Sequence, residues 1–349
     1  MSKNMINRAI VGLATGLALL ATPALAETGA EQRQNFEASF DTVLGTEVRA
    51  PQVYRADYDS NFERLIAGLA DGSKGRIGVA AMDLTTGQSI SILGDQRFPM
   101  ASTSKIAIAA TFLEGVDQGR WSLTSEFPLM VPQSSSAFST RVAPVKPGAY
   151  LSASTLLDIM ITRSNNQATD ALLKVVGGPQ AVNDWARRAG ITDFTLSRDI
   201  ATLVRDDGEI DPARQIDLRD SATPQAMVQM LAGLHEGKWL SRSSRNLIIN
   251  TMERTRTGKR RIRGLMPADV TVANKTGSLN NTSSDIGFIT GPDGHTIAVA
   301  IYVTGQGARP NRESRIASIA RGLYDGYQTQ IRHMANARYS RPGTVGSAN

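Results

Sequence analysis

The sequence of 349 residues contains no cysteine and only three histidines. Without a thiol the chain cannot form a disulfide, a thiolate zinc site or a cysteine nucleophile. A histidine-rich metal site or a Ser-His-Asp triad would have to use His235, His295 or His333. Nothing in the sequence indicates a metal, a nucleotide or another cofactor, and we expect none.

The chain also lacks the dense positive charge of a nucleic-acid-binding protein. Its 38 lysines and arginines against 32 aspartates and glutamates give a formal charge of +6, a mild excess at this length. Nucleic-acid binders concentrate basic residues in a patch or stripe. We therefore expect no nucleic-acid partner, and because nothing indicates an oligomer we expect a monomer.

No segment after the N-terminus approaches the roughly 18 apolar residues of a membrane-spanning helix. The first residues combine Lys3 and Arg8 with an apolar run over 9–21 and the small-residue ending Ala24-Leu25-Ala26. This order is typical of a secretory signal peptide. We predict that residues 1–26 are a signal peptide cleaved after Ala26, and that the mature protein is periplasmic or secreted without membrane insertion.

Strand patterns occur near both ends of the chain, and helical patterns fill the middle. We expect strands at residues 77–84, 89–93, 270–273, 286–289 and 296–303. We expect helices at 61–69 and from 313 to about 327, and mostly helical structure from about 103 to 235. These elements predict an α/β (α+β) fold, in which an antiparallel sheet built from both chain ends is flanked by helices and joined to an all-α subdomain.

The expected domain boundaries follow from this order of elements. Residues 27–70 form an N-terminal helical extension, residues 71–330 the main domain, and residues 331–349 a flexible tail. Within the main domain, 71–102 and 240–330 make the α/β part and 103–239 the all-α part. A cleft between the two parts is the natural place for a site.

The first motif that carries chemistry is Ser102-Thr103-Ser104-Lys105, directly before an apolar helical run. A serine and a lysine at positions i and i+3 share one face of a helix. A buried lysine near other cations loses its proton more easily and can act as the base that histidine supplies elsewhere. The exposed first turn of an ordinary helix can have the same pattern, so this motif alone does not distinguish a catalytic pair from such a helix start.

Two further motifs follow in the chain. In Ser164-Asn165-Asn166 a hydroxyl and an amide stand two residues apart, suited to relaying a proton and holding an amide, although a capping serine gives the same pattern. In Lys275-Thr276-Gly277-Ser278 the glycine lets a substrate backbone lie close, and the lysine and hydroxyls can bind a carboxylate.

The ordered set S-x-x-K, S-x-N and K-T-G resembles the signature of class A β-lactamases and penicillin-binding proteins. The resemblance runs from about Arg76 to Tyr324, and supporting segments are residues 97–100, 156–161, 219–224 and 265–267. It implies the β-lactamase and penicillin-binding transpeptidase type of fold. It also implies a serine hydrolase without a cofactor, acting on a small-molecule β-lactam or a cell-wall stem peptide.

By this resemblance Ser102 is the nucleophile that forms an acyl-enzyme, and Lys105 is its base. Ser164 passes the proton to the leaving nitrogen, Lys275 adds positive potential, and Asn166 holds the side-chain amide of the substrate. The backbone N–H groups of Ser102 and Ser278 form the oxyanion hole, and Thr276, Gly277 and Ser278 line the binding strand. The family also uses an arginine for the substrate carboxylate; the candidates here are Arg261 and Arg263.

The main departure from the family lies in the loop between Ser164 and Asp220. Class A enzymes carry a glutamate there, which activates the water for deacylation. When the sequence is aligned forward from Ser164, Ile200 takes the place of this glutamate. When it is aligned backward from Asp220, Asp207 takes that place. The two alignments differ by seven residues, so an insertion lies inside the loop. Asp207 is one methylene shorter than glutamate, and Glu209 is the other candidate, unless this acidic cluster is only a solvated loop.

Three hypotheses follow. The first is a β-lactamase that opens β-lactam amides and releases the product. The second is a penicillin-binding D-alanyl peptidase or esterase acting on cell-wall peptides. The third is a protein that acylates once and stays blocked, or binds peptidoglycan without chemistry. The complete motif set favours catalysis, and the departure in the loop argues against an efficient β-lactamase.

Overall fold

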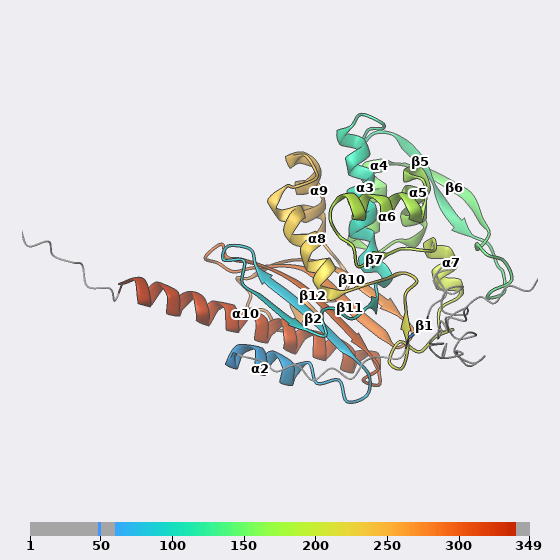
Figure 1. Ribbon diagram of the computed structural model, residues 1–349. Coiled ribbons are helices and arrows are strands. Elements are labelled where there is room, and N and C mark those ends of the chain that lie inside the picture. The colour runs from blue at the N-terminus through green and yellow to red at the C-terminus, as the bar shows by residue number, and fades with distance from the viewer. Residues whose placement is uncertain (1–47, 50–59, 340–349) are drawn as a thin grey trace, which may run out of the picture.

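The computed structural model describes residues 48–49 and 60–339. Its largest sheet has five antiparallel strands in the order β10-β11-β12-β2-β3. These strands are β2 (Ile77–Asp83), β3 (Ser89–Ile92), β10 (Thr271–Leu279), β11 (Thr282–Thr290) and β12 (Thr296–Thr304). The C-terminal strand β12 pairs with the N-terminal strand β2, which confirms the predicted sheet made from both chain ends (Figure 1).

Helices cover both faces of this sheet. On one face lie α2 (Asn61–Leu69) and α10 (Arg309–Tyr339); on the other lies α8 (Pro224–Glu236), below the helical block (Figure 1). Because side chains alternate along a strand, Val79 and Ala81 of β2 pack toward α2 and α10, whereas Ala80 joins the core of the helical block. The sheet therefore separates two hydrophobic cores.

The helical block is centred on α3 (Lys105–Asp117), which is buried at every position from Lys105 to Leu113. A helix that is apolar all round is an interior helix. Around it lie α4 (Ala153–Thr162), α5 (Asn166–Val176), α6 (Pro179–Arg188) and α9 (Arg242–Glu253). This block joins the sheet through α3 and α9, which contact each other, and α9 also contacts β10.

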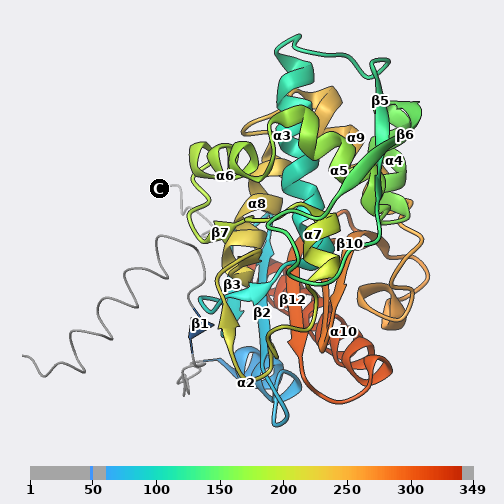
Figure 2. The same ribbon diagram turned by 90° about the vertical axis from the view of Figure 1, so that its right-hand side faces the viewer.

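Two small sheets accompany the helical block and were not expected. The hairpin of β5 (Glu126–Pro132) and β6 (Val145–Ser152) lies beside α5, at the edge of the block (Figure 2). Its prolines and glycine are signals of loops, and they are tolerated because the hairpin is an edge whose side chains are almost all partly or fully exposed. The second sheet joins β4 (Phe98–Pro99), β9 (Ser221–Ala222) and β7 (Phe194–Thr195).

The ends of the chain differ partly from the prediction. The predicted helix 61–69 is present, and β1 (Val48–Arg49) pairs with β8 (Ile216–Asp217). The predicted signal peptide, residues 1–26, lies outside the described residues. The C-terminal helix continues to Tyr339, past the expected end near residue 327, because no glycine or proline interrupts residues 328–339.

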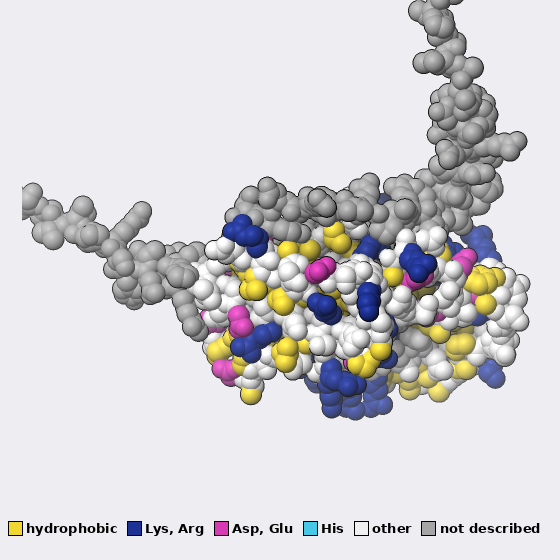
Figure 3. All heavy atoms as spheres, turned by 90° about the horizontal axis from the view of Figure 1, so that it is seen from below, with side chains coloured by type: hydrophobic (Ala, Val, Ile, Leu, Met, Phe, Trp, Pro, Cys, Tyr) yellow, Lys and Arg dark blue, Asp and Glu magenta, His cyan; other side chains and the backbone are white. Residues whose placement is uncertain are grey.

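The underside of the molecule, where α2 and α10 lie, is polar at its surface. Figure 3 shows that Lys and Arg side chains predominate over Asp and Glu side chains on this face, in keeping with the positive formal charge. Hydrophobic side chains appear there only in small groups. In the described part of the chain, no helix is long and apolar enough to cross a membrane.

Candidate active site

The serine of the first motif lies on a tight turn. β4 leads into a short 3-10 helix, Ala101–Ser104, which continues directly into α3. Ser102 is half-buried on this turn, and Lys105, the first residue of α3, is fully buried. Ala101 has a φ of 49°, a left-handed conformation that strains a non-glycine residue and often marks functional sites. Ser102 thus lies one helical turn before Lys105 in the chain.

The second motif lies between α4 and α5 and meets both lysines. Lys105 Nζ donates to the Ser164 carbonyl at 2.8 Å, to Ser164 Oγ at 3.1 Å and to Asn166 Oδ1 at 2.8 Å. Lys275 Nζ donates to the same Ser164 Oγ at 2.9 Å. Ser164 itself has a φ of 57°. The structure therefore brings the three sequence motifs together, with the Ser164 hydroxyl between two lysine amines.

Both lysines are fully buried, and burial changes how they hold protons. Burial lowers the pKa of Lys105 well below its ordinary value; the charge of Lys275 lowers it further, and the charge of Asp170 acts in the opposite direction. Burial also lowers the pKa of Lys275 to about 7, against the opposing charge of Asp285. A lysine that is neutral near physiological pH can accept a proton from a hydroxyl.

The third motif lies on β10, which passes directly over the serine turn. A Cβ on Gly277 would lie 2.7 Å from the Met100 carbonyl oxygen and 3.1 Å from the Ala101 Cβ. Only glycine permits this approach. Ser278, the next residue, is exposed near the end of the strand. The strand that crosses the serine turn therefore presents the exposed Ser278 hydroxyl near its end.

Of the two candidate arginines, Arg261 lies beside the K-T-G strand. Its guanidinium is 1% exposed and donates to the Gly277 carbonyl and to Ser278 Oγ, each at 2.7 Å. Glu313 of α10 forms an ion pair with it at 3.2 Å. Arg263 instead donates to Asn274 Oδ1 at 2.9 Å, four residues before Ser278 on the same strand. Arg261 can thus hold Ser278 in place and add positive charge at this edge.

One buried carboxylate beside the lysines was missed by the sequence reasoning. Asp170 lies on α5, four residues after Asn166, and is 6% exposed. Its two oxygens accept hydrogen bonds from the N–H groups of Ile200 at 2.7 Å and Ala201 at 2.9 Å. Burial raises its pKa to about 7. The i, i+4 spacing from Asn166, which puts both side chains on one helix face, is the signal that could have found it.

The loop that ends at Asp220 is closed by an ion pair at its neck. Arg198 Nε lies 2.6 Å from Asp220 Oδ2, and both side chains are largely buried. Directly after Arg198, Asp199 caps the short helix α7 (Ile200–Arg205) through a hydrogen bond from Thr202 N. Ile200, which takes the place of the family's glutamate in the forward frame, is buried on this helix. In this forward frame the extra residues follow α7, before β8 and Asp220.

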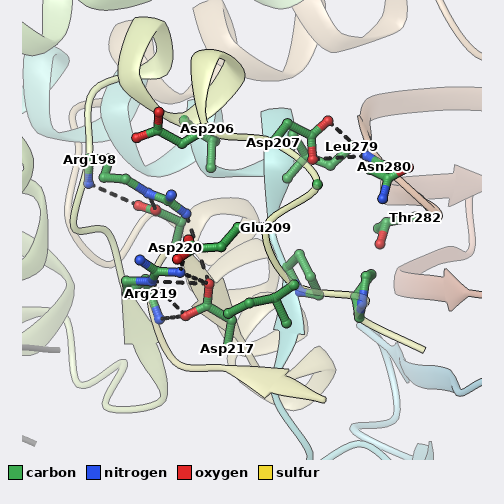
Figure 4. A pocket seen from close by; sticks show the side chains of 15 residues that line it. Arg198, Asp206, Asp207, Glu209, Asp217, Arg219, Asp220, Leu279, Asn280 and Thr282 are labelled. Carbon is green, nitrogen blue, oxygen red and sulfur yellow. Dashed lines mark hydrogen bonds and ion pairs between the residues drawn. The ribbon is translucent and has the colours of Figure 1, made fainter. Parts of the chain in front are cut away.

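The two candidate loop carboxylates have partners of their own (Figure 4). Asp207 accepts two hydrogen bonds from the N–H of Asn280 in the β10–β11 turn, at 2.8 and 3.0 Å. Glu209 forms an ion pair with Arg219 at 2.8 Å. Neither forms a hydrogen bond or ion pair with Lys105, Ser164 or Lys275 among the described residues. Both fasten the inserted segment to its surroundings.

The histidines lie away from this site. His235 ends α8, where its ring packs near Phe288 at 5.9 Å, and His295 lies in the turn before β12, 3.8 Å from Asp83. His333 is on the last part of α10. Among the described residues, no group of His, Asp and Glu side chains is arranged to hold a metal ion. The basic groups where the three motifs meet are the amines of Lys105 and Lys275.

An antiparallel sheet with helices on both faces, a helical block beside it and these three motifs between them define the class A β-lactamase type of protein. The model of the β-lactamase enzyme family matches residues 61–327, and this chain belongs to that family.

Known relatives and solved structures agree with this assignment. The extended-spectrum β-lactamase PER-1 of Pseudomonas aeruginosa is 28% identical over 273 residues, 74% of this chain and 85% of PER-1. The β-lactamase CTX-M-97 of Escherichia coli is 28% identical over 271 residues, 77% of this chain and 90% of the relative. The crystal structure of a β-lactamase from Chitinophaga pinensis is similar with a TM-score of 0.67, at 28% identity, over 77% of this chain and all of that one. An ancestral class A β-lactamase is 32% identical with a TM-score of 0.66, over 76% of this chain and 99% of the other.

The electrostatic coupling between Asp170 and Lys105 gives a first prediction. The Asp170 charge raises the pKa of Lys105, so Asp170→Asn lowers that pKa further. Nuclear magnetic resonance of ¹³C-labelled lysine side chains measures the titration, with Lys105→Arg identifying the signal. The exposed Asp184 supplies the control Asp184→Asn, which leaves the titration unchanged. An upward shift, or no shift, in Asp170→Asn contradicts the coupling.

Proposed function

We propose that this chain is a serine hydrolase that opens β-lactam amides through an acyl-enzyme on Ser102. The observation that carries the proposal is the Ser164 hydroxyl, held between Lys105 Nζ at 3.1 Å and Lys275 Nζ at 2.9 Å, beside the serine turn. Membership of the β-lactamase family supports the substrate class. The site requires no metal or cofactor for this reaction.

In the proposed acylation, neutral Lys105 takes the proton from the Ser102 hydroxyl while Oγ attacks the lactam carbonyl carbon. The N–H groups of Ser102 and Ser278 stabilise the resulting oxyanion. The carbon–nitrogen bond then breaks, and the leaving nitrogen receives a proton from the Ser164 hydroxyl, which is replaced by the proton on Lys105. Lys105 and Ser164 are already hydrogen-bonded, so this relay needs no rearrangement.

The remaining residues of the site hold the substrate. Asn166 offers its side-chain amide to the acyl side chain while its Oδ1 is bound by Lys105. Thr276 and Ser278 offer hydroxyl groups to the ring carboxylate. Arg261, which donates a hydrogen bond to Ser278 Oγ, adds positive charge next to them. Lys275 supplies positive potential beside the leaving nitrogen.

A second candidate function, a penicillin-binding peptidase or esterase whose β-lactam adduct persists, is favoured by one observation. In the forward frame Ile200 takes the place of the family's deacylating glutamate, and an isoleucine cannot activate water. Asp207 and Glu209, the alternative bases, are bound to the hairpin turn and to Arg219. The difference between the two functions is the lifetime of the acyl-enzyme.

We also propose that the protein is exported after cleavage of residues 1–26. The pattern of Lys3, Arg8, the apolar run and Ala24-Leu25-Ala26 supports this placement. Both β-lactams and cell-wall stem peptides are encountered outside the cytoplasm, so export agrees with either candidate function.

The nucleophile is tested by incubating the protein with a chromogenic cephalosporin and measuring its colour and the intact mass of the protein. We expect the mass of an opened β-lactam to be added to the wild type, and no adduct and no colour release with Ser102→Ala. The buried neighbour Ser104 gives the control Ser104→Ala, which keeps the adduct, since its hydroxyl only binds the Ala101 carbonyl. An adduct that survives Ser102→Ala contradicts the mechanism.

The source of the deacylating base is tested by variants of the loop. Because Asp207 and Glu209 are bound elsewhere, we expect Asp207→Ala and Glu209→Ala each to change turnover less than about threefold, against the roughly hundredfold or larger loss for a general base. Ile200→Glu, combined with Asp170→Asn to remove like-charge repulsion, should shorten the lifetime of the acyl-enzyme at least about tenfold.

The control for the gain of turnover is Ile200→Gln with Asp170→Asn, which has the same size but no base. A large loss in Asp207→Ala or Glu209→Ala would identify that residue as the base and contradict the assignment of both side chains to the loop. Equal adduct lifetimes in the Glu and Gln variants would show that Ile200 does not occupy the position of the glutamate.

A further inference from the structure

Three exposed cations border one edge of the site. Arg163 directly precedes Ser164, and Arg256 and Lys259 lie on the loop that follows α9. All three side chains are exposed. We call Arg163, Arg256 and Lys259 the basic rim. None of the reactions proposed above uses them.

Two contacts fix the loop after α9 beside the reacting groups. The N–H of Arg256 donates to the Thr162 carbonyl at 2.9 Å, which joins the loop to the end of α4, one residue before Arg163. Thr257 Oγ1 lies 2.7 Å from Thr276 Oγ1, which joins the same loop to the K-T-G strand. The rim therefore spans the gap between the Ser164 turn and β10, the two elements that hold Ser164 and Lys275.

The close packing of this loop requires glycine. Gly258 has a φ of 69°, and a Cβ there would lie 2.3 Å from Thr276 Cγ2. The loop is thus pressed against the strand between Arg256 and Lys259, and its backbone position is set. The backbone that carries Arg256 and Lys259 is therefore held against the strand of Lys275 and Thr276.

The charge of the rim is not neutralised by neighbouring carboxylates. Asp158 forms an ion pair with Arg254 at 2.9 Å. Glu313 forms ion pairs with Arg261, Arg309 and Arg260. Within residues 60–331, none of the three rim side chains forms an ion pair or hydrogen bond of its own. Unpaired cations at the edge of a cleft attract anions and raise their rate of association.

We propose that the basic rim selects β-lactams that carry an additional negative charge on the ring joined to the lactam nitrogen. This inference rests on the proposed function, in which Ser164 protonates that nitrogen. Substituents of the nitrogen-bearing ring then lie on the Ser164 side, next to Arg163 and Arg256. The ring carboxylate common to these substrates is already bound by Thr276 and Ser278, so the rim is free for a second anion.

Three cephalosporins with the same acyl side chain test the inference. Cefotaxime is neutral at the C3 substituent, ceftriaxone is anionic there, and cefepime is cationic. The measured quantity is the second-order rate constant for acylation of Ser102, obtained by competition with a chromogenic cephalosporin, which applies whether or not the adduct turns over. At low salt we expect ceftriaxone to exceed cefotaxime about fivefold and cefepime to fall below it. Salt at 0.5 M should remove most of the difference, because it screens exposed charges.

Single substitutions locate the effect. Arg163→Gln and Arg256→Gln should each lower the ratio of ceftriaxone to cefotaxime about twofold, and leave the cefotaxime rate within a factor of two. Arg242→Gln, at the exposed start of α9, removes the same charge away from the site and should leave the ratio unchanged. Equal rates for the three cephalosporins, or equal effects of Arg242→Gln and the rim variants, would overturn the inference while leaving Ser102 acylation intact. Absence of acylation by all three would instead overturn the proposed function, and the inference with it.

Discussion

The rest of this site depends on the burial of two lysines around one hydroxyl. Lys105 and Lys275 both donate hydrogen bonds to Ser164 Oγ, and water is largely excluded from both amines. Two buried ammonium groups repel each other and lose hydration, so at least one releases its proton easily. Asp170 and Asp285 offset part of this cost. The same burial and repulsion lower the pKa of Lys105 well below its ordinary value, which suits it to the proposed role of base.

The fold supplies the rigidity that this arrangement requires. Lys105 begins the most deeply buried helix, and Lys275 lies on a strand paired along its full length with β11. Ser164 is held by a strained turn between α4 and α5. The loop between Ser164 and Asp220 is closed by the ion pair of Arg198 with Asp220, and Ile200 is buried on the short helix that follows Arg198. The residues proposed for acylation are thus all present, whereas neither alignment of the loop supplies the glutamate of the family.

The sequence predicts much of this architecture because its signals are local. The hairpin turn at 291–294, the alternation in β12 and the S-x-x-K spacing each lie within a few residues. The hairpin β5–β6 was missed because its prolines and glycine are loop signals, and Asp170 because its importance comes from residues 30 positions away. The partners of Asp207 and Glu209 depend on tertiary contacts with Asn280 and Arg219, which no pattern in the loop reveals.

We propose that Lys105, whose pKa burial lowers well below its ordinary value, is the base for acylation of Ser102. The most direct test is the acylation rate constant of the wild-type protein as a function of pH. Because the neutral amine is the active form, the rate should rise with pH and level off well below the ordinary lysine pKa of 10.5. A rate that continues to rise until about that pH would show that Lys105 is not perturbed as described and would contradict the claim.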